Sequence, residues 1–252
     1  MDRVDTGIVG LDAALSGGIP KSNLVLLSGG AGTGKSTMCM HFLIAGAKKG
    51  EKSIYVSTEQ TEKELVKQAE KYSLPLAELV SSGLIKVVFI DILNDESVLE
   101  KIRAELKTFV PDRVVIDSLS TFSEFSSAGD FAREILLRRG GVANRAVDTV
   151  VPQKISERTM VKRMLGMLIS SLRSLGATIV MTSELPERGD HMSSDGVSEY
   201  LVDGVVVLHH LGVGLTQFRS LQVRKMRYTK HSNEIFGYDF AANGISFVDN
   251  AV

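Results

Sequence analysis

A glycine-rich octapeptide near the start of the chain constrains its fold more than any other segment. It matches the pattern G-x-x-x-x-G-K-S/T and runs Gly29-Gly30-Ala31-Gly32-Thr33-Gly34-Lys35-Ser36. An apolar run, Asn23–Ser28, precedes it, and a helical pattern, Lys35–Lys48, follows. Such a loop curls so that its backbone N–H groups point at phosphate oxygens, and the helix start adds partial positive charge. The motif therefore predicts a strand–loop–helix unit that binds a nucleotide. The alternative is a glycine-rich turn that matches by accident.

The positions of this loop have separate expected roles. Lys35 is expected to reach the β- and γ-phosphates, which gives it a part in catalysis as well as in binding. The Ser36 hydroxyl is expected to ligate Mg²⁺. The other nucleotide-binding candidates share the loop or the first helical turn, and they are Gly30, Ala31, Gly32, Thr33, Gly34 and Thr37.

Short apolar runs alternate with longer helical patterns through the first 183 residues. Further strands are expected at Ser53–Thr58, Leu84–Ile90, Arg113–Asp117 and Ala177–Thr182. Helices are expected to begin at Thr61, which starts a capping-box pattern with Glu64, and to cover Asp95–Phe109. One more helix has an apolar face spaced at 3.6 residues, made by Val161, Met164, Leu165, Leu168, Leu172 and Leu175. Strand–helix alternation of this kind predicts a parallel sheet with helices on both faces.

After about residue 200 the pattern changes to consecutive strands. They are expected at Leu201–His210, Thr216–Tyr228, Glu234–Phe240 and Ile245–Val248. Glycines and an Asn243-Gly244 pair divide them, which predicts an antiparallel meander that extends the parallel sheet. Because no stretch resembles a linker, residues 1–252 are predicted to form one α/β domain.

Two carboxylates stand where metal and water chemistry would need them. Asp117 ends the apolar strand Val114-Val115-Ile116, at the sheet edge where the phosphate loop also emerges, so it can hold Mg²⁺ directly or through water. The alternative for Asp117 is a helix N-cap. Glu59 follows another apolar strand and could polarise a water for attack on the γ-phosphate. The alternative for Glu59 is a solvated residue near a helix start.

Composition excludes several protein classes. With 29 Lys and Arg against 30 Asp and Glu, the net charge is −1, so the chain is not a wholesale polyanion binder. A single cysteine, Cys39, excludes an intramolecular disulfide framework and fits a reducing compartment. Apolar runs fall short of the ~18 residues that a membrane span needs, and the N-terminus shows no secretory signal pattern. A cytoplasmic protein is expected.

Several segments together resemble the KaiC-type ATPases of the RecA superfamily, in particular archaeal single-domain members and RadA paralogues. The resemblance covers nearly the whole chain, with a gap around residues 126–160. It rests on the phosphate loop and on six other segments, which are Thr6–Asp12, Gly17–Pro20, Tyr55–Glu59, Val115–Leu119, Val202–Val205 and Lys225–His231.

The resemblance implies a RecA-type core that binds ATP and Mg²⁺, in a hexameric ring with nucleotide at the subunit interfaces. It also implies that Lys225 and Arg227 act in trans on the γ-phosphate of a neighbour, where charge accumulates in the transition state, and that His231 belongs to the same nucleotide site. The alternative for Lys225 and Arg227 is an alternating, solvent-facing pair on a strand.

Three departures from the family pattern matter. Gln60 stands where many relatives carry a second glutamate, and because an amide is no base, hydrolysis is expected to be slower or to rest on Glu59 alone. Tyr228 stands where relatives often have glycine. The cyanobacterial clock protein has two such domains, so its autokinase behaviour and phosphorylation sites do not transfer to this chain.

A basic segment, Ser126–Arg163, is longer than the resemblance leads us to expect. It carries eight Lys and Arg against four Asp and Glu, a net charge of +4. In RecA-like rings such loops face the central axis, so the segment is a candidate contact for single-stranded DNA or RNA. Its only aromatic residue is Phe131, which gives little support for base stacking. The alternatives are a solvated helix–loop and a contact to the adjacent subunit.

The sequence therefore favours an oligomeric, Mg²⁺-dependent ATPase with a regulatory or DNA-repair role. One alternative is a nucleotide-gated assembly module with little turnover, which Gln60 favours. Another is a serine/threonine autokinase, since an interfacial γ-phosphate could reach a hydroxyl of a neighbour.

Overall fold

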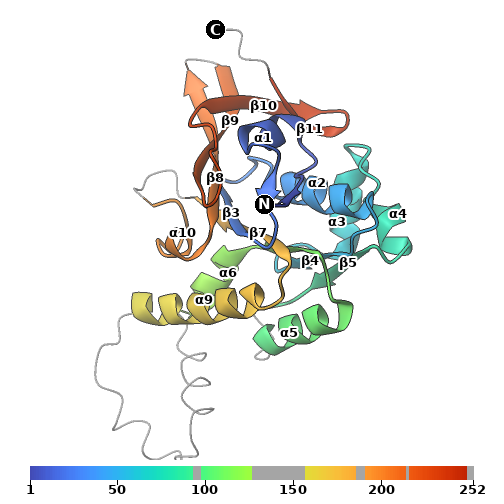
Figure 1. Cartoon of the computed structure of the whole chain (residues 1–252), viewed down its shortest axis with the longest axis vertical. Coiled ribbons are helices and arrows are strands. Elements are labelled where there is room, and N and C mark those ends of the chain that lie inside the picture. Colours follow the sequence, from blue (N-terminus) through green and yellow to red (C-terminus); the bar gives the residue numbers. More distant parts are fainter. Residues whose placement is uncertain (93–97, 127–156, 186–190, 214–215, 249–252) are drawn as a thin grey trace, which may run out of the picture.

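A computed structural model describes residues 1–92, 98–126, 157–185, 191–213 and 216–248 (Figure 1). In these residues one large sheet has the strand order β11-β10-β9-β8-β3-β7-β6-β4-β5. Its strands are β3 (Leu24–Gly29), β4 (Ser53–Ser57), β5 (Ile85–Phe89), β6 (Arg113–Asp117), β7 (Thr178–Glu184), β8 (Gly204–Val213), β9 (Thr216–Met226), β10 (Ile235–Ala241) and β11 (Gly244–Phe247). A separate two-stranded sheet pairs β1 (Arg3–Val4) with β2 (Ile19–Pro20).

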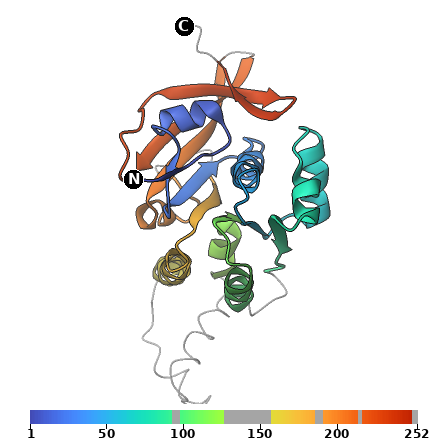
Figure 2. The same ribbon diagram turned by 45° about the vertical axis from the view of Figure 1, so that its right-hand side comes forward.

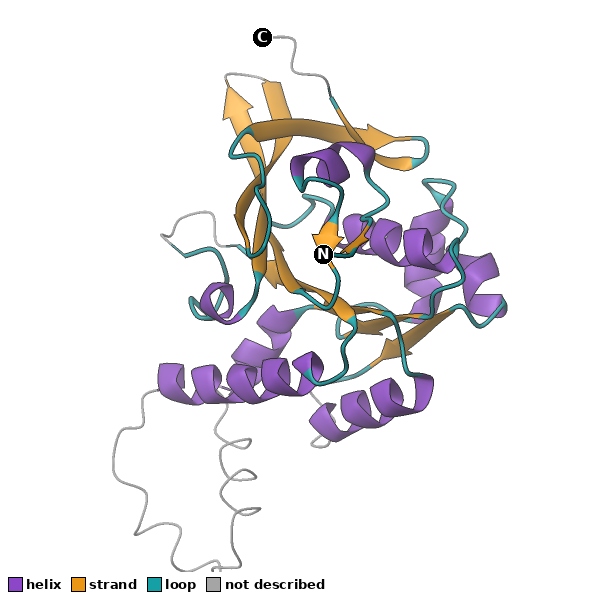
Figure 3. Cartoon of the chain, in the orientation of Figure 1, coloured by secondary structure: helices purple, strands orange, loops and turns teal. Residues whose placement is uncertain are grey.

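The large sheet has a parallel part and an antiparallel part. Strands β5, β4, β6, β7, β3 and β8 run parallel, whereas β9, β10 and β11 continue from β8 in antiparallel pairs. In Figure 3, drawn in the orientation of Figure 1, this extension lies at the top of the molecule, whereas α5, α6 and α9 lie in its lower half. At the last hairpin Gly244 has a φ of 101°, a conformation that favours glycine. The predicted fold class, a mainly parallel sheet with an antiparallel C-terminal extension, is confirmed.

Helices cover both faces of the parallel part (Figures 1 and 2). One face carries α1 (Val9–Ala14), α2 (Lys35–Ala47), α3 (Glu62–Glu70) and α4 (Leu76–Ser81). The other carries α5 (Val98–Phe109), α6 (Leu119–Ser126) and α9 (Glu157–Arg173), and a short helix, α10 (Ser198–Leu201), precedes β8.

Alternation along the strands produces two hydrophobic cores. On β3, Val25 and Leu27 pack into the core under α2, whereas Leu24 and Leu26 pack into the core under α9. A strand that is apolar on both faces is what a doubly covered parallel sheet requires. The central strand β3 therefore holds the loop that follows it between two rigid layers.

Most helix predictions are confirmed, and four short helices of the described residues were missed. Thr61 caps α3 with the full capping box. Of the predicted apolar face of α9, Met164, Leu165, Leu168 and Leu172 are buried, whereas Leu175 follows the end of the helix and is half-buried. The sequence did not predict α1, α4, α6 or α10, which have four to eight residues each. Segments this short show barely two turns of periodicity, so tertiary packing rather than pattern sets them.

Candidate nucleotide-binding site

An open cavity of about 550 Å³ lies at the carboxyl ends of the parallel strands. In open α/β sheets this edge is where ligands bind, and the volume is within the usual range for small-molecule sites. The cavity is lined by Ala31, Gly32, Gly34, Lys35, Ser36, Thr37, Glu59, Gln60, Gln68, Tyr72, Asp117, Glu184 and Phe240. The structure thus brings the loop and both predicted carboxylates together.

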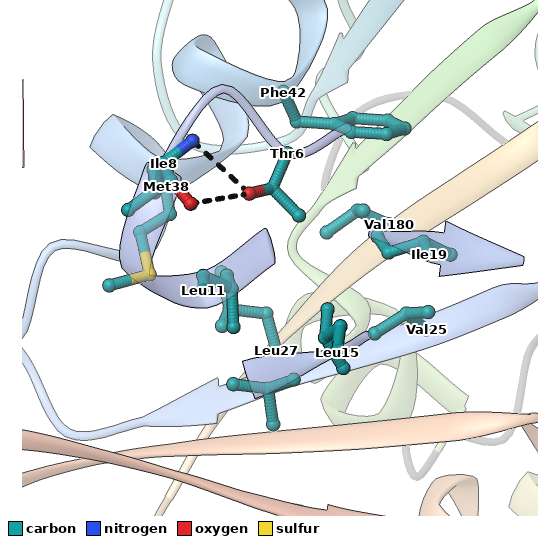
Figure 4. A pocket seen from close by; sticks show the side chains of 11 residues that line it. Thr6, Ile8, Leu11, Leu15, Ile19, Val25, Leu27, Met38, Phe42 and Val180 are labelled. Atoms are coloured by element: carbon teal, nitrogen blue, oxygen red, sulfur yellow. Dashed lines mark hydrogen bonds between the residues drawn. The ribbon is translucent and has the colours of Figure 1, made fainter. Parts of the chain in front are cut away.

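A second, much smaller cavity lies inside the core and has a different character. It measures about 30 Å³ and is lined by apolar side chains of the N-terminal segment, α2 and the sheet (Figure 4). Its polar lining residue, Thr6, already donates to the Ile8 carbonyl and accepts from the Ile8 N–H. This cavity is a packing defect rather than a site for a charged ligand.

The loop between β3 and α2 has the backbone that its glycines predict. Gly32 and Gly34 have φ values of 73° and 98°, which L side chains rarely adopt. A Cβ on Gly34 would also come within 2.9 Å of the Phe240 ring. Gly34 is therefore required for both its conformation and its contact with β10. The loop leads straight into α2, whose N-terminus faces the cavity.

Lys35 lies in the cavity with three partners. Its Nζ donates to the carbonyls of Gly29 at 2.9 Å and Gly30 at 3.0 Å, and it forms an ion pair with Glu184 Oε1 at 2.7 Å. Its side chain is 8% exposed. The sequence predicted the position of Lys35 beside the phosphates but did not predict Glu184 as its partner.

Ser36 and Asp117, the two predicted metal ligands, are within hydrogen-bond distance of each other. Ser36 Oγ donates to Asp117 Oδ2 at 2.8 Å, and the hydroxyls of Tyr55 and Thr182 also donate to this carboxylate. These partners come from α2, β4 and β7, so the carboxylate is oriented by the sheet rather than serving as a helix cap. Burial, together with the charge of Asp117, raises the pKa of Tyr55 well above its usual value and keeps its phenol protonated as a donor.

The chemistry of this pair fits a small divalent cation. Magnesium prefers hard oxygen ligands and is commonly held by one carboxylate, one hydroxyl and phosphate oxygens. Asp117 is 7% exposed and borders the cavity, so its carboxylate can turn to a cation there without leaving the sheet edge. In the described residues, no group of three or more His, Cys, Asp or Glu side chains could hold a metal ion.

Glu59 lies in the short connection between β4, which ends at Ser57, and α3, which begins at Glu62. Its carboxylate is exposed to the cavity, and Oε1 accepts a hydrogen bond from Ser118 Oγ at 2.7 Å. Thr121 Oγ1 lies 3.5 Å from the same oxygen. Glu59 is therefore anchored by one hydroxyl while it keeps contact with water, which is the situation that a general base for water needs. Gln60 lines the same cavity.

The other predicted residues, Lys225, Arg227 and His231, are not brought into this cavity. Lys225 pairs with Val205 near the start of β8, and β8 starts beside Val25 of β3. That is the amino end of the parallel strands, about 13 Å along β3 from the start of the phosphate loop. His231 Nδ1 contacts only the neighbouring Ser232 carbonyl, at 3.0 Å, among the hydrogen bonds of the described residues. Within one chain Lys225 and Arg227 cannot reach a phosphate held by Lys35, and His231 does not line the cavity.

Lys225 is half-buried. Its Nζ donates to the carbonyls of Glu199 at 3.0 Å and Val202 at 2.6 Å. Burial, reinforced by the charge of Arg227, lowers the pKa of Lys225. A half-buried ammonium with two carbonyl partners is more constrained than the solvent-facing pair that was the alternative.

Arg227 shares a carboxylate with a residue of α9. Both Arg227 Nη1 and Arg173 Nη1 contact Asp203, at 3.2 Å and 2.8 Å. Burial alone would raise the pKa of Asp203, but the hydrogen bonds from Arg173 and the Leu24 N–H outweigh it and lower the pKa. The adjacent Tyr228 has a φ of 62° and is 70% exposed. A glycine at this position would fit that left-handed backbone.

Four cavity residues were missed by the sequence analysis: Gln68, Tyr72, Glu184 and Phe240. Tyr72 and Phe240 stack on each other with ring centroids 5.2 Å apart, and Tyr238 on the same strand donates to the Thr33 carbonyl at 2.6 Å. The antiparallel extension thus covers one side of the phosphate loop. A carboxylate after a parallel strand is the same signal that revealed Asp117, and it could have revealed Glu184.

Two other expectations concern surfaces outside this site. The basic segment that was expected to contact nucleic acid lies largely in residues 127–156, outside the described residues. Among the helices of the described residues, none is both long enough and apolar enough to cross a bilayer.

Comparison with known proteins agrees with the site. The family model described as "ATPase: KaiC" matches residues 4–139 and 136–252. A UPF0273 protein of Methanopyrus kandleri is 30% identical over 97% of this chain and 91% of its own length. The circadian clock oscillator protein KaiC of Parasynechococcus marenigrum is 27% identical over 98% of this chain, which spans only 44% of that protein.

A solved structure extends the likeness to three dimensions. The crystal structure of a KaiC-like protein from Pyrococcus horikoshii superposes with a TM-score of 0.77 at 27% identity, covering 98% of this chain and 99% of that one. With the phosphate loop, both carboxylates and the RecA-type sheet in place, the chain belongs to the KaiC family of ATPases and is a nucleotide-binding protein of the RecA superfamily.

Proposed function

We propose that this chain binds ATP with Mg²⁺ and hydrolyses it in an oligomer. The observation that carries the proposal is the convergence of Lys35, Ser36, Glu59 and Asp117 on one cavity at the carboxyl edge of the sheet. These four supply a cationic hydrogen-bond donor for the phosphates, two cation ligands and a base, which is the set that phosphoryl transfer to water needs. Bound Mg²⁺ would neutralise charge on the phosphate oxygens.

The residues of this chain divide the remaining work. The loop N–H groups and Lys35 hold the phosphates, Ser36 and Asp117 would hold the Mg²⁺ ion, and Glu59 accepts a proton from the attacking water. Ser118 fixes the Glu59 carboxylate through its 2.7 Å hydrogen bond. The stacked rings of Tyr72 and Phe240 border the cavity and suit a nucleobase.

Lys225 and Arg227 act on the nucleotide of a neighbouring copy in this proposal. Their position at the amino end of the strands rules out a role in their own cavity and suits a head-to-tail contact, in which one end of a subunit meets the other end of the next. Such heterologous contacts close into rings when the rotation permits, and a hexamer is the form we propose.

A mixing experiment tests hydrolysis and the trans role together. Glu59→Gln removes the proposed base but keeps Lys225, the cation that acts in trans. Lys225→Ala removes that cation but keeps the base. Each variant alone should release little phosphate. Mixed at concentrations that allow assembly, Glu59→Gln subunits should complete the sites of Lys225→Ala subunits and raise turnover several-fold above the sum of the two. Absence of recovery at every mixing ratio would contradict the trans role.

A nucleotide-gated assembly module is the second candidate, and Gln60 is the observation that favours it. Gln60 lines the cavity beside Glu59 but cannot accept a proton. In that case ATP would drive assembly while phosphate release stays negligible in the wild type. Sedimentation with ATP and with ADP, run beside the turnover assay and with single-stranded DNA as a further condition, separates this module from the ATPase.

A further inference from the structure

Glu184 has a place in the cavity that the proposed chemistry does not use. It is the last residue of β7, directly beside Gly29 in the parallel pairing of β3 and β7. Its Oε1 is 2.7 Å from Lys35 Nζ, and its side chain is 43% exposed. A carboxylate therefore sits on the ammonium group that is expected to receive the terminal phosphates.

The ammonium group of Lys35 has no hydrogen left for a phosphate. An ammonium has three N–H donors, and the carbonyls of Gly29 and Gly30 and the carboxylate of Glu184 take all three. A phosphate oxygen can bind Lys35 only if one of these partners gives way.

Of the three partners, Glu184 is the one that a phosphate displaces. The two carbonyls belong to the backbone of the loop and its strand, and they carry no net charge. Glu184 is negatively charged, like the phosphate, and its half-exposed side chain has solvent to turn into. Its backbone stays in place, because its N–H donates to Ser120 Oγ at 2.7 Å and the next N–H, of Leu185, donates to the Gly29 carbonyl at 3.1 Å.

We propose that Glu184 is a resident anion that holds Lys35 in the empty site and competes with the terminal phosphates of the nucleotide. This inference rests on the proposed function. The carboxylate opposes ATP more than ADP, because the γ-phosphate adds charge on the side of the nucleotide that Lys35 reaches. After phosphate leaves, Glu184 pairs with Lys35 again and weakens the hold on ADP.

Glu184→Gln tests the competition with little change of shape. The amide keeps a neutral acceptor for Lys35 but loses the charge that makes the contact strong and repels phosphate. Calorimetric titrations with ATP, ADP and tripolyphosphate, in excess Mg²⁺ and in a Glu59→Gln background that suppresses turnover, give the dissociation constants. We expect ATP and tripolyphosphate to bind about 10-fold tighter in the Glu184→Gln variant, about 1.4 kcal/mol, with a smaller gain for ADP.

Glu78→Gln is the matched control, because it removes one exposed carboxylate on α4 that does not line the cavity. An equal gain in this variant would show a bulk charge effect and overturn the inference. Unchanged or weaker ATP binding by the Glu184→Gln variant, with a native circular dichroism spectrum, would overturn it as well, and would assign Glu184 to catalysis if turnover in the Glu59-containing chain is also lost. If neither the parent nor any variant binds ATP, ADP or tripolyphosphate, the proposed function itself fails and this inference fails with it.

Discussion

The two ends of the parallel sheet both carry charged side chains, but they use them in opposite ways. At the carboxyl end, Lys35 and Asp117 border an open cavity, and one partner of Lys35, the half-exposed Glu184 carboxylate, is a group that we propose a phosphate displaces. At the amino end, Lys225 is held by two backbone carbonyls and Arg227 by the Asp203 carboxylate. The carboxyl end of the parallel strands borders a cavity that suits a ligand. At the amino end, Lys225 and Arg227 are held in place near the surface of the chain.

This contrast teaches how one chain can carry two halves of one site. A cation that acts on a transition state must be placed before the reaction, because reorganisation during the reaction costs catalytic power. The carbonyls under Lys225 and the carboxylate under Arg227 provide that placement without covering the charged groups completely. In the proposed head-to-tail assembly, the anchored end of one subunit completes the open end of the next.

The strongest test of the difference between the two ends is Lys225→Met, which keeps the length of the side chain and removes its charge. We expect turnover to fall about 1,000-fold, the lower range for a cationic finger, while the dissociation constant for ATP changes less than about twofold. Phosphate release and calorimetric titration on the same preparation measure the two quantities. If ATP affinity falls together with turnover, the amino end contributes to ground-state binding and the division between the ends is wrong.

Lys35→Ala tests the carboxyl end of the parallel strands and, unlike Lys225→Met, should weaken ATP binding as well as turnover. Loss of a charge-assisted contact to the phosphates is expected to weaken ATP binding about 100-fold, about 2.7 kcal/mol, and to abolish measurable turnover. The Glu184 carboxylate then also loses its partner in the empty site. Titration with ATP, with Lys225→Met as the comparison variant, checks the result. Unaltered affinity for ATP would remove Lys35 from the binding site.

The amino-acid sequence predicts the site at the carboxyl ends of the parallel strands much better than it predicts the residues that surround this site. The loop, Asp117 and Glu59 each follow an apolar strand, and parallel strands place their carboxyl ends at one edge, so local pattern suffices to bring them together. Tyr72 and Phe240 meet only because β10 lies over the loop, and Glu184 meets Lys35 only because β7 neighbours β3. Strand order is a property of the whole sheet, and the periodicity of a single segment does not contain it.

A histidine on α2, the helix that follows the phosphate loop, allows a pH test of how the antiparallel extension is held to this helix. His41 Nε2 accepts the Ile245 N–H of β11 at 3.1 Å, and burial lowers the pKa of His41, with Lys48 adding repulsion and a hydrogen bond with the Gly7 backbone opposing it. The neutral form is thus favoured in the folded state. Its contribution to stability is fully present above the unfolded pKa of about 6.5 and is lost as the pH falls through the lower folded value.

Replacement of this histidine should remove that pH dependence. In the wild type we expect the melting temperature to fall between pH 7.5 and 5, and in the His41→Gln variant to fall less, with a loss of about 1 kcal/mol at pH 7.5 for the altered hydrogen bond. His210→Gln, at an exposed position, controls for removal of an ordinary histidine. Equal pH dependence in the wild type and the His41→Gln variant would mean that other groups govern acid stability.

The smallest effect concerns the backbone beside the anchored cations, at Tyr228. A non-glycine residue in the left-handed region costs about 1–2 kcal/mol, and glycine adopts it freely but loses about 0.4–1 kcal/mol through greater entropy of the unfolded chain. Because Tyr228 is 70% exposed, removal of its side chain costs little packing. Tyr228→Gly should therefore raise the free energy of unfolding by about 0.5 kcal/mol, measured by urea denaturation. Tyr228→Ala keeps the strain and should give no gain. If Tyr228→Ala raises the free energy of unfolding as much as Tyr228→Gly, the exposed ring rather than the left-handed backbone destabilises the wild type. If glycine destabilises it, the ring makes a contact that holds the strand end carrying Arg227 in place.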